Sequence, residues 1–307
     1  MTERKRFNQV YLEITNRCNL RCPFCPGTAR PAAFMKRELF RRIIAQLPEL
    51  TNQVYFHVMG EPLLHPDFAA FIADCGALPQ PLPVAVTTNG SRLGTPAAEA
   101  LLHPDVRQVN ISLHSLYPLA GTAAGEQRLA EIFAFTRQAM IRRPDLYLNF
   151  RLWNLDTIRD NPSERNLWLL QQIRSAFPDA LPADTLPGGH KSRRLSGRLY
   201  LSLDTVFAWP EIRPDTPKRT FGFCHGLVDQ LAILVDGTVV PCCLDREGVI
   251  NLGNVAATPL AEILAAPRTA TMRNGFTRGE LVEELCRYCT FRTRFKRNPG
   301  TPSEPVI

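Results

Sequence analysis

Apolar and polar positions follow two alternating periods through the first two thirds of the chain. Short apolar runs rich in β-branched and aromatic residues predict strands at residues 10–14, 54–58, 84–87, 109–113, 146–152 and 199–203. Between them, apolar residues recur every three or four positions, which predicts helices near residues 38–47, 68–75, 126–141 and 165–177. Strands separated by helices pair in parallel through crossover connections. The pattern therefore predicts an α/β fold built on a parallel sheet.

The last third of the chain predicts a smaller unit of a different kind. An apolar run over residues 231–240 is interrupted by Asp236-Gly237, a pair that favours the tight turn of a β-hairpin. A chain of 307 residues that is 45% hydrophobic can form one large core and a small appended unit. No uninterrupted apolar run approaches the roughly 20 residues that span a bilayer, so we expect no membrane segment.

Distinctive polar motifs fall at or just after the ends of the predicted strands. These motifs are the cysteine run 18–25, the turn 60–62, Asn89, and the stretch 112–114. In barrels of alternating strands and helices, the carboxyl ends of the strands carry the active site. We therefore expect the functional site at this rim of the fold.

Three cysteines after the first strand, Cys18, Cys22 and Cys25, have the spacing C-x3-C-x2-C. Three thiolates leave one iron of a four-iron cluster with an open position, which a catalytic site requires. A structural zinc site would need a fourth ligand, and no histidine lies at a suitable spacing from Cys25. The polar, basic N-terminus has no apolar signal region, so we expect a cytoplasmic protein without disulfides.

A second set of cysteines lies in the last third, where Cys286 and Cys289 form a C-x2-C pair. The predicted hairpin would bring Cys224 and Cys242 to the same end, and the pair could complete a four-thiolate site. Cys243 could take the place of Cys242. Zinc bound by four thiolates is the structural alternative to an iron–sulfur cluster at this site.

The cysteine spacing, with an aromatic residue before the last cysteine, resembles that of the radical S-adenosylmethionine (SAM) enzymes. The turn Met59-Gly60-Glu61-Pro62 resembles their Gly-Gly-Glu-Pro motif, with methionine in place of the first glycine. The resemblance implies a partial (β/α)6 TIM-like barrel in which SAM binds a [4Fe–4S] cluster and yields a 5′-deoxyadenosyl radical. It implies SAM contacts from Phe24, Gly60, Glu61, Pro62, Asn89, Ser112 and Arg151, with His114 as an alternative to Ser112 and Asn154 as an alternative to Arg151.

The C-terminal cysteines resemble those of the twitch domain, a shortened SPASM domain that binds an auxiliary cluster. The resemblance implies a barrel over residues 1–205, a small α+β domain (a β-hairpin plus helix) over 206–300, and a tail over 301–307. No cysteine follows Cys289, which implies a single auxiliary [4Fe–4S] cluster, and we expect this cluster to transfer electrons or to shape the substrate pocket. The implied ligands are Cys224, Cys242, Cys286 and Cys289.

The resemblance implies hydrogen-atom abstraction, and we expect the dehydrogenation of a small molecule. Radical modification of a peptide or protein side chain is the alternative, and a flavodoxin- or ferredoxin-like protein is the expected electron donor. A third alternative is a non-enzymatic iron–sulfur or zinc protein that binds nucleic acid, because the net charge is +7. The basic residues are scattered, which argues against nucleic acid. Candidates for the group that accepts the departing proton are Arg151, Tyr200 and Asp245.

Overall fold

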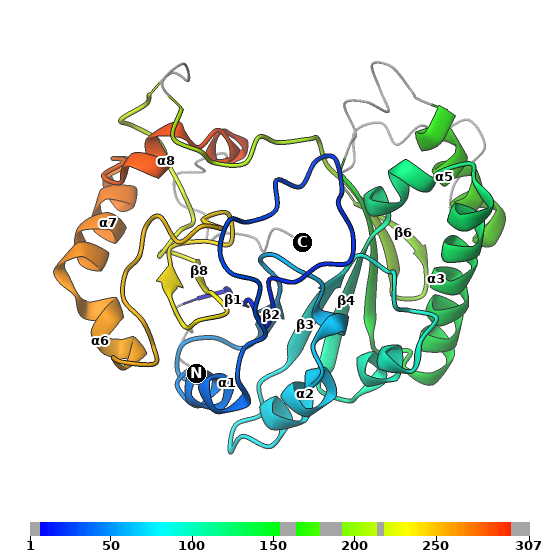
Figure 1. The fold of residues 1–307 in the computed structure, drawn as a ribbon, viewed down its shortest axis with the longest axis horizontal. Helices are drawn as coiled ribbons and strands as arrows, with labels where there is room; N and C mark the ends of the chain where they lie inside the picture. Colours follow the sequence, from blue (N-terminus) through cyan, green and yellow to red (C-terminus); the bar gives the residue numbers. More distant parts are fainter. Residues whose placement is uncertain (1–6, 154–163, 179–191, 214–217, 296–307) are drawn as a thin grey trace.

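The computed structural model describes residues 7–153, 164–178, 192–213 and 218–295. Asn154 and the expected tail over 301–307 lie outside these residues. The chain forms one curved, mostly parallel sheet with helices ranged around its outside, and the loop after the first strand crosses the middle of the molecule (Figure 1). Among the helices that the structure describes, none is long and apolar enough to span a membrane.

Six parallel strands form the greater part of the sheet, in the order β7-β5-β4-β3-β2-β1. They are β1 (Gln9–Leu12), β2 (Val54–Phe56), β3 (Val84–Thr88), β4 (Val106–Ser112), β5 (Tyr147–Leu152) and β7 (Leu199–Leu203). The crossovers contain α1 (Arg37–Ile44), α2 (Phe68–Gly76), α3 (Ala123–Arg142) and α5 (Glu164–Ala176), with short 3-10 helices η1 (Pro62–Leu64), η2 (Pro96–Leu102) and η3 (Leu113–Leu119). The six predicted strands and four predicted helices are confirmed, with ends that differ by up to three residues.

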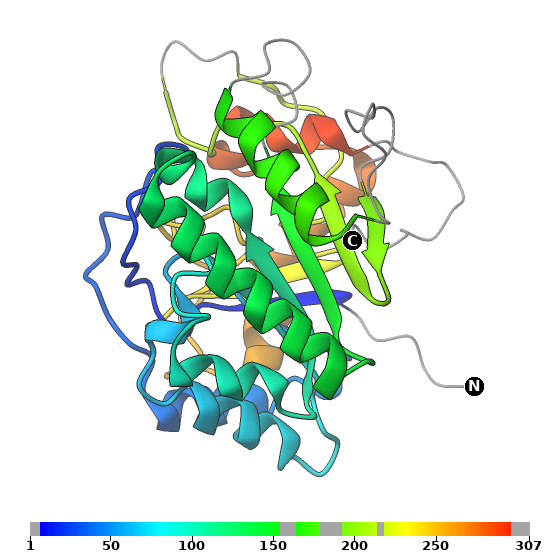
Figure 2. The same cartoon turned by 90° about the vertical axis from the view of Figure 1, so that its right-hand side faces the viewer.

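The two faces of the sheet have different chemistry. On the outer face, α3 and α5 (green in Figure 2) cover part of the sheet, and the fully buried ring of Phe56 on β2 meets that of Phe40 on α1 with 5.7 Å between centroids. Phe40 of α1 stacks on Phe71 of α2 with 3.9 Å between ring centroids. Burial of each such side chain stabilises the fold by about 1.5–3 kcal/mol. The inner face, which we call the lumen, is polar: the Asn149 amide donates to Oδ1 of Asn110 at 3.1 Å.

The edge strand β6 (Ser192–Ser196) was not predicted. It pairs antiparallel with β7, so the last crossover carries a hairpin in addition to α5. The sequence Ser-Arg-Arg-Leu-Ser has one apolar residue, Leu195, and this is the only one of the five that is buried. An edge strand with one side chain in the core gives no alternating pattern for sequence analysis to detect.

The C-terminal hairpin extends the barrel sheet instead of standing apart from it. It consists of β8 (Gln230–Ile233) and β9 (Val239–Val240), and β8 pairs in parallel with β1 along its whole length. Leu234 N–H donates to Thr238 O at 2.8 Å, and Gly237 takes φ +90° in the turn, so the predicted hairpin is confirmed. The segment ends in α6 (Leu260–Ala265), α7 (Pro267–Arg278), α8 (Glu284–Tyr288) and the 3-10 helix η4 (Phe291–Arg294).

Candidate functional site

The loop between β1 and α1, residues 13–36, carries the first three cysteines, and we call it the cysteine loop. Cys18 and Cys25 are exposed, Cys22 is partly exposed, and all three are free thiols. Cys25 N–H donates to Cys22 O at 3.0 Å, so the loop turns tightly between them. Burial and the neighbouring thiols raise the pKa of Cys22 to about 11, so a bound cation is needed to hold it as a thiolate. Three soft thiols on one open loop suit an iron–sulfur cluster.

The turn after β2 supports the base of the cysteine loop. Glu61 N–H donates to Arg17 O at 2.8 Å. Gly60 has φ +79°, and a Cβ at this position would lie 2.4 Å from the carbonyl oxygen of Thr15. The close approach that this glycine permits is therefore to the chain's own cysteine loop. Only glycine allows both this backbone conformation and this contact.

The Glu61 carboxylate joins the turn after β2 to the end of β3. It is fully buried and accepts hydrogen bonds from Leu63 N (3.1 Å), Thr88 Oγ1 (2.8 Å) and Asn89 N (2.6 Å). Burial raises its pKa to about 7. Pro62 occupies the first position of η1, where its missing N–H removes no helical bond. The carboxylate therefore organises the turn and positions Asn89.

Asn89 points at the cysteine loop, as its place at the end of β3 predicted. Its amide donates to Asn19 Oδ1 at 3.1 Å and lies 3.6 Å from the sulfur of Cys18. On the neighbouring strands, Ser112 and Arg151 pair in register and so lie side by side. The ring of Phe24 meets that of His114 edge-on at 4.8 Å, so the cysteine loop also reaches the end of β4.

Arg151 projects into the lumen as a partly buried cation, and its guanidinium lies over the ring of Trp153 at 5.0 Å from the ring centroid. Among the described residues, no carboxylate lies within ion-pair distance of it, although Tyr11, Tyr55 and Cys243 face it. Burial lowers its pKa. Burial also lowers the pKa of His57 to about 3, and Arg151 adds to the effect by repulsion, so this histidine stays neutral. Because a partly desolvated cation with no acidic partner among the described residues gains from an anion, this position favours a ligand with an acidic group.

Four of the C-terminal cysteines line one small cavity of about 30 Å³. They are Cys224, Cys242, Cys286 and Cys289, the four predicted to act together. Cys243 does not line it and interacts instead with Tyr11 and Arg151 in the lumen. Burial raises the pKa of Cys224 to about 11. Four soft donors around one cavity suit an iron–sulfur cluster. In the described ranges, no three His, Cys, Asp or Glu side chains form a group that could hold a single metal ion.

Two of the three candidate proton acceptors are engaged elsewhere. The Asp245 carboxylate is buried and accepts hydrogen bonds from Val249 N (2.9 Å) and Ile250 N (2.8 Å), so it shapes the loop after Cys243. Tyr200 stacks on Tyr147 with 4.7 Å between ring centroids. Arg151 faces the lumen, but its guanidinium is a cation with no acceptor lone pair, so it can bind an acidic group and cannot take the departing proton.

Sequence analysis missed an aromatic wall between the two cysteine sets. A cavity of about 280 Å³ opens beside Phe24, and the rest of its lining includes Phe207, Trp209, Arg246 and Tyr288. Phe207 lies 4.9 Å from Phe291, near the second cysteine set. The stretch after residue 203 has no strand or helix periodicity, so its aromatic residues carried no signal.

Comparison with known proteins identifies two regions of the chain. The family model of the radical SAM superfamily matches residues 12–161, and that of an iron–sulfur cluster-binding domain, SPASM, matches residues 224–290. Among curated proteins, the GTP 3′,8-cyclase of Vibrio cholerae serotype O1 is 30% identical over 137 residues, which are 42% of this chain and 41% of the relative. The GTP 3′,8-cyclase of Aeromonas hydrophila is 34% identical over 138 residues, 42% of this chain and 40% of the relative. The chain thus matches about two fifths of the length of these relatives.

Solved structures share the fold over most of the chain. BtrN in complex with AdoMet and 2-DOIA has a TM-score of 0.56 at 16% identity, with 93% of this chain and 94% of that chain covered. A polyhistidine-tagged anSMEcpe with bound AdoMet has a TM-score of 0.58 at 11% identity, with 88% and 83% covered. Both matches include the partial barrel and the C-terminal segment. The chain belongs to the radical SAM superfamily, as an enzyme that uses SAM and a [4Fe–4S] cluster and carries a C-terminal SPASM iron–sulfur domain.

Proposed function

We propose that this enzyme dehydrogenates a small polar molecule held in the lumen between its two cysteine sets. The observation that carries the proposal is the polar lumen around Arg151, a partly buried cation that faces Tyr11 and Tyr55. Asn89 lies beside Cys18 of the first cysteine set, and Cys243, the neighbour of Cys242 in the second set, interacts with Tyr11 and Arg151. A small molecule rich in hydroxyl groups would find donors and acceptors on several strands here.

The first three cysteines, Cys18, Cys22 and Cys25, would hold the cluster to which SAM binds. When bound, cluster and SAM supply a 5′-deoxyadenosyl radical for hydrogen-atom abstraction. The residues proposed to hold SAM are Phe24, Gly60, Glu61, Pro62, Asn89, Ser112 and Arg151, with Arg151 on the SAM carboxylate. Within this group, Glu61 acts by holding the cysteine loop and Asn89, since its oxygens are occupied by the chain's own donors.

The second set, Cys224, Cys242, Cys286 and Cys289, would hold the auxiliary [4Fe–4S] cluster. Loss of a hydrogen atom followed by loss of one electron and one proton oxidises an alcohol to a carbonyl. The auxiliary cluster is the proposed acceptor of that electron, and we place its domain after residue 205. A flavodoxin- or ferredoxin-like protein is the proposed donor for SAM cleavage, because the net charge of +7 would attract an acidic protein.

A peptide or protein side chain is the second candidate substrate. The cavity of about 280 Å³ beside Phe24 favours it, because aromatic walls suit a side chain inserted from outside. Similar folds do not decide between the two, since one matched structure is BtrN in complex with 2-DOIA and another is anSMEcpe with a bound peptide. The GTP 3′,8-cyclases match only 120 to 138 residues, so their substrate is no guide to this one.

Anaerobic reconstitution followed by iron, sulfide and 5′-deoxyadenosine assays tests the proposal. We expect about eight irons per chain and reductive SAM cleavage, which Cys22→Ala abolishes. Candidate alcohols and peptides, each deuterated, are then compared for deuterium transfer into 5′-deoxyadenosine. Transfer from an alcohol with formation of a carbonyl supports the proposal. Transfer only from peptides replaces it with the second candidate, and absence of SAM cleavage under every condition refutes both.

A further inference from the structure

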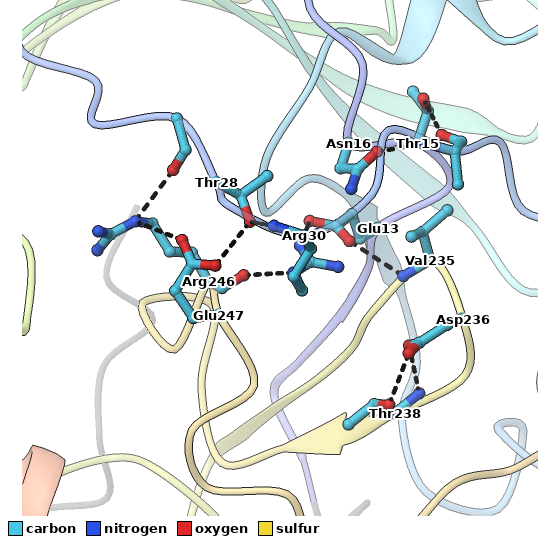
Figure 3. A network of polar contacts seen from close by, with 12 residues as sticks. Glu13, Thr15, Asn16, Thr28, Arg30, Val235, Asp236, Thr238, Arg246 and Glu247 are labelled. Carbon is cyan, nitrogen blue, oxygen red and sulfur yellow. Dashed lines mark hydrogen bonds and ion pairs between the residues drawn. The ribbon is translucent and has the colours of Figure 1, made fainter.

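The part of the cysteine loop that follows Cys25 is held by two residues of the C-terminal segment. Arg246 Nε donates to Gly27 O at 3.0 Å. The Glu247 carboxylate accepts hydrogen bonds from Thr28 Oγ1 at 3.0 Å and from Ala29 N at 3.1 Å. Figure 3 shows these contacts converging from two segments that are more than 200 residues apart in sequence.

A buried ion pair extends the contact to the base of the loop. Arg30 lies 2.6 Å from Glu13, whose side chain is fully buried, and Arg30 Nε donates to Arg246 O at 2.7 Å. The second oxygen of Glu13 accepts from Val235 N at 3.0 Å, in the turn of the C-terminal hairpin (Figure 3). Burial raises the pKa of Glu13 while Arg30 opposes the rise. One network therefore joins the loop's base, its distal half and the hairpin.

The three cysteines are thus held from both ends of their run. On the preceding side, the backbone of Arg17 accepts from Glu61. On the following side, the side chains of Arg246 and Glu247 bond residues 27–29 from outside the loop. The Arg30 side chain adds a hydrogen bond to the carbonyl oxygen of Arg246. These two residues come soon after Cys242, and Asp245 beside them stiffens their loop through two backbone hydrogen bonds. A short, well-bonded path therefore connects Cys25 with Cys242.

We propose that Glu247 and Arg246 are positioning residues that set the placement of Cys25 relative to the second cysteine set. The inference rests on the proposed roles of the two sets as cluster ligands. Each bond of the network involves a charged side chain, and such hydrogen bonds are worth more than neutral ones. Among the contacts that the structure describes, no other side chain from outside the loop anchors residues 26–30. If these hydrogen bonds are lost, a small displacement of residues 26–30 therefore also moves Cys25, a proposed cluster ligand.

The test compares Glu247→Ala and Glu247→Gln with Glu262→Ala, a control at an exposed glutamate of α6 in the same segment. Hydrogen exchange is followed in peptides covering residues 26–35, in cluster-free and in reconstituted protein. Loss of two charge-assisted hydrogen bonds should speed exchange about tenfold or more in Glu247→Ala. Glu247→Gln keeps one acceptor oxygen and should be intermediate, and Glu262→Ala should match the unmodified protein.

A spectroscopic readout separates positioning from mere stability. In reconstituted protein, the electron paramagnetic resonance signal of the reduced first cluster and its change on SAM addition should be altered in Glu247→Ala and partly restored in Glu247→Gln. Unchanged exchange in residues 26–35 would overturn the proposal. So would faster exchange with an unaltered signal, because the contacts would then hold the loop without placing the cluster. If the unmodified protein bound no iron, the proposed function would fail, whereas the exchange comparison would still decide whether Glu247 holds the loop.

Discussion

Glu61 provides the most quantitative prediction, because its carboxylate is buried, fully hydrogen-bonded and shifted in pKa. Substitution by glutamine keeps the shape but turns one oxygen into an NH2 group. Asn89 N–H and Leu63 N–H bond different oxygens of the carboxylate, so in the variant one of these two N–H groups must face the new NH2 group, which is also a donor. An unsatisfied buried N–H costs about 1–3 kcal/mol. We therefore expect Glu61→Gln to be less stable than the unmodified protein at pH 5.

The pH dependence of stability gives a second, independent signature of Glu61. Burial raises its pKa from 4.5 to about 7 in the folded state. Between these values the folded protein binds more protons than the unfolded chain, so the free energy of unfolding falls as pH rises. The stabilisation that protonated Glu61 gives the folded state is complete below its pKa in the unfolded chain and is lost above its pKa in the folded protein. A shift of this size corresponds to about 3 kcal/mol, of which about 2–3 kcal/mol falls between pH 5 and pH 8.

Urea unfolding at pH 5 and pH 8 measures both effects. The loss of stability from pH 5 to pH 8 should be smaller in Glu61→Gln than in the unmodified protein by about 2–3 kcal/mol. Subtracting the two proteins cancels the contributions of other titrating groups, including His57, whose pKa is lowered to about 3. Glu262→Gln, at the surface of α6, serves as the control and should leave the pH dependence unchanged. Equal pH dependence in Glu61→Gln and the unmodified protein would refute the reasoning.

Four further substitutions probe the loop, the second cysteine set and the lumen. Gly60→Ala should lower the unfolding free energy by at least about 2 kcal/mol and weaken SAM binding in equilibrium dialysis, because its Cβ would lie 2.4 Å from the Thr15 carbonyl oxygen. Cys242→Ser should lower bound iron from about eight to about four per chain, whereas Cys243→Ser should leave it near eight. Arg151→Leu should change the free energy of unfolding by no more than about 1 kcal/mol, because the guanidinium is partly exposed and its described partner is the Trp153 ring, yet it should slow 5′-deoxyadenosine formation at least about tenfold.

The barrel was predictable because its strands and crossover helices have distinct periods. In each of the six parallel strands, apolar residues are either consecutive or alternate with polar ones, whereas in the amphipathic helices apolar residues recur every three or four positions. The proximity of Asn89 to Cys18 could be predicted because both follow the carboxyl ends of parallel strands, which lie at the same rim of the sheet. The four thiols around one cavity followed from the hairpin and the C-x2-C pair.

What sequence analysis missed depends on contacts between distant segments. Cys242 and Cys243 are adjacent and chemically identical, so only the folded chain separates the cavity-facing thiol from the one that faces Tyr11. Arg30 looks like an ordinary charged loop residue, and Glu13 like a polar position of the predicted strand, until folding brings the two together in an ion pair. Glu247 reads as surface charge, although its carboxylate lies against Thr28. None of these pairings leaves a local pattern, because each is set by how the C-terminal segment meets the cysteine loop.

The pairing of β8 with β1 explains why the two cysteine sets should respond to one another. Strand β1 lies between β2 and β8, and it leads directly into the cysteine loop. The register runs unbroken from Gln9 with Gln230 to Leu12 with Ile233, so the hairpin cannot shift without breaking sheet hydrogen bonds. Glu13, the first residue after β1, then bonds Val235, the second after β8. The proposed boundary near residue 205 divides the chain between two cysteine sets, but the sheet continues across it. A substitution that loosens β8 should therefore disturb the cysteine loop as well.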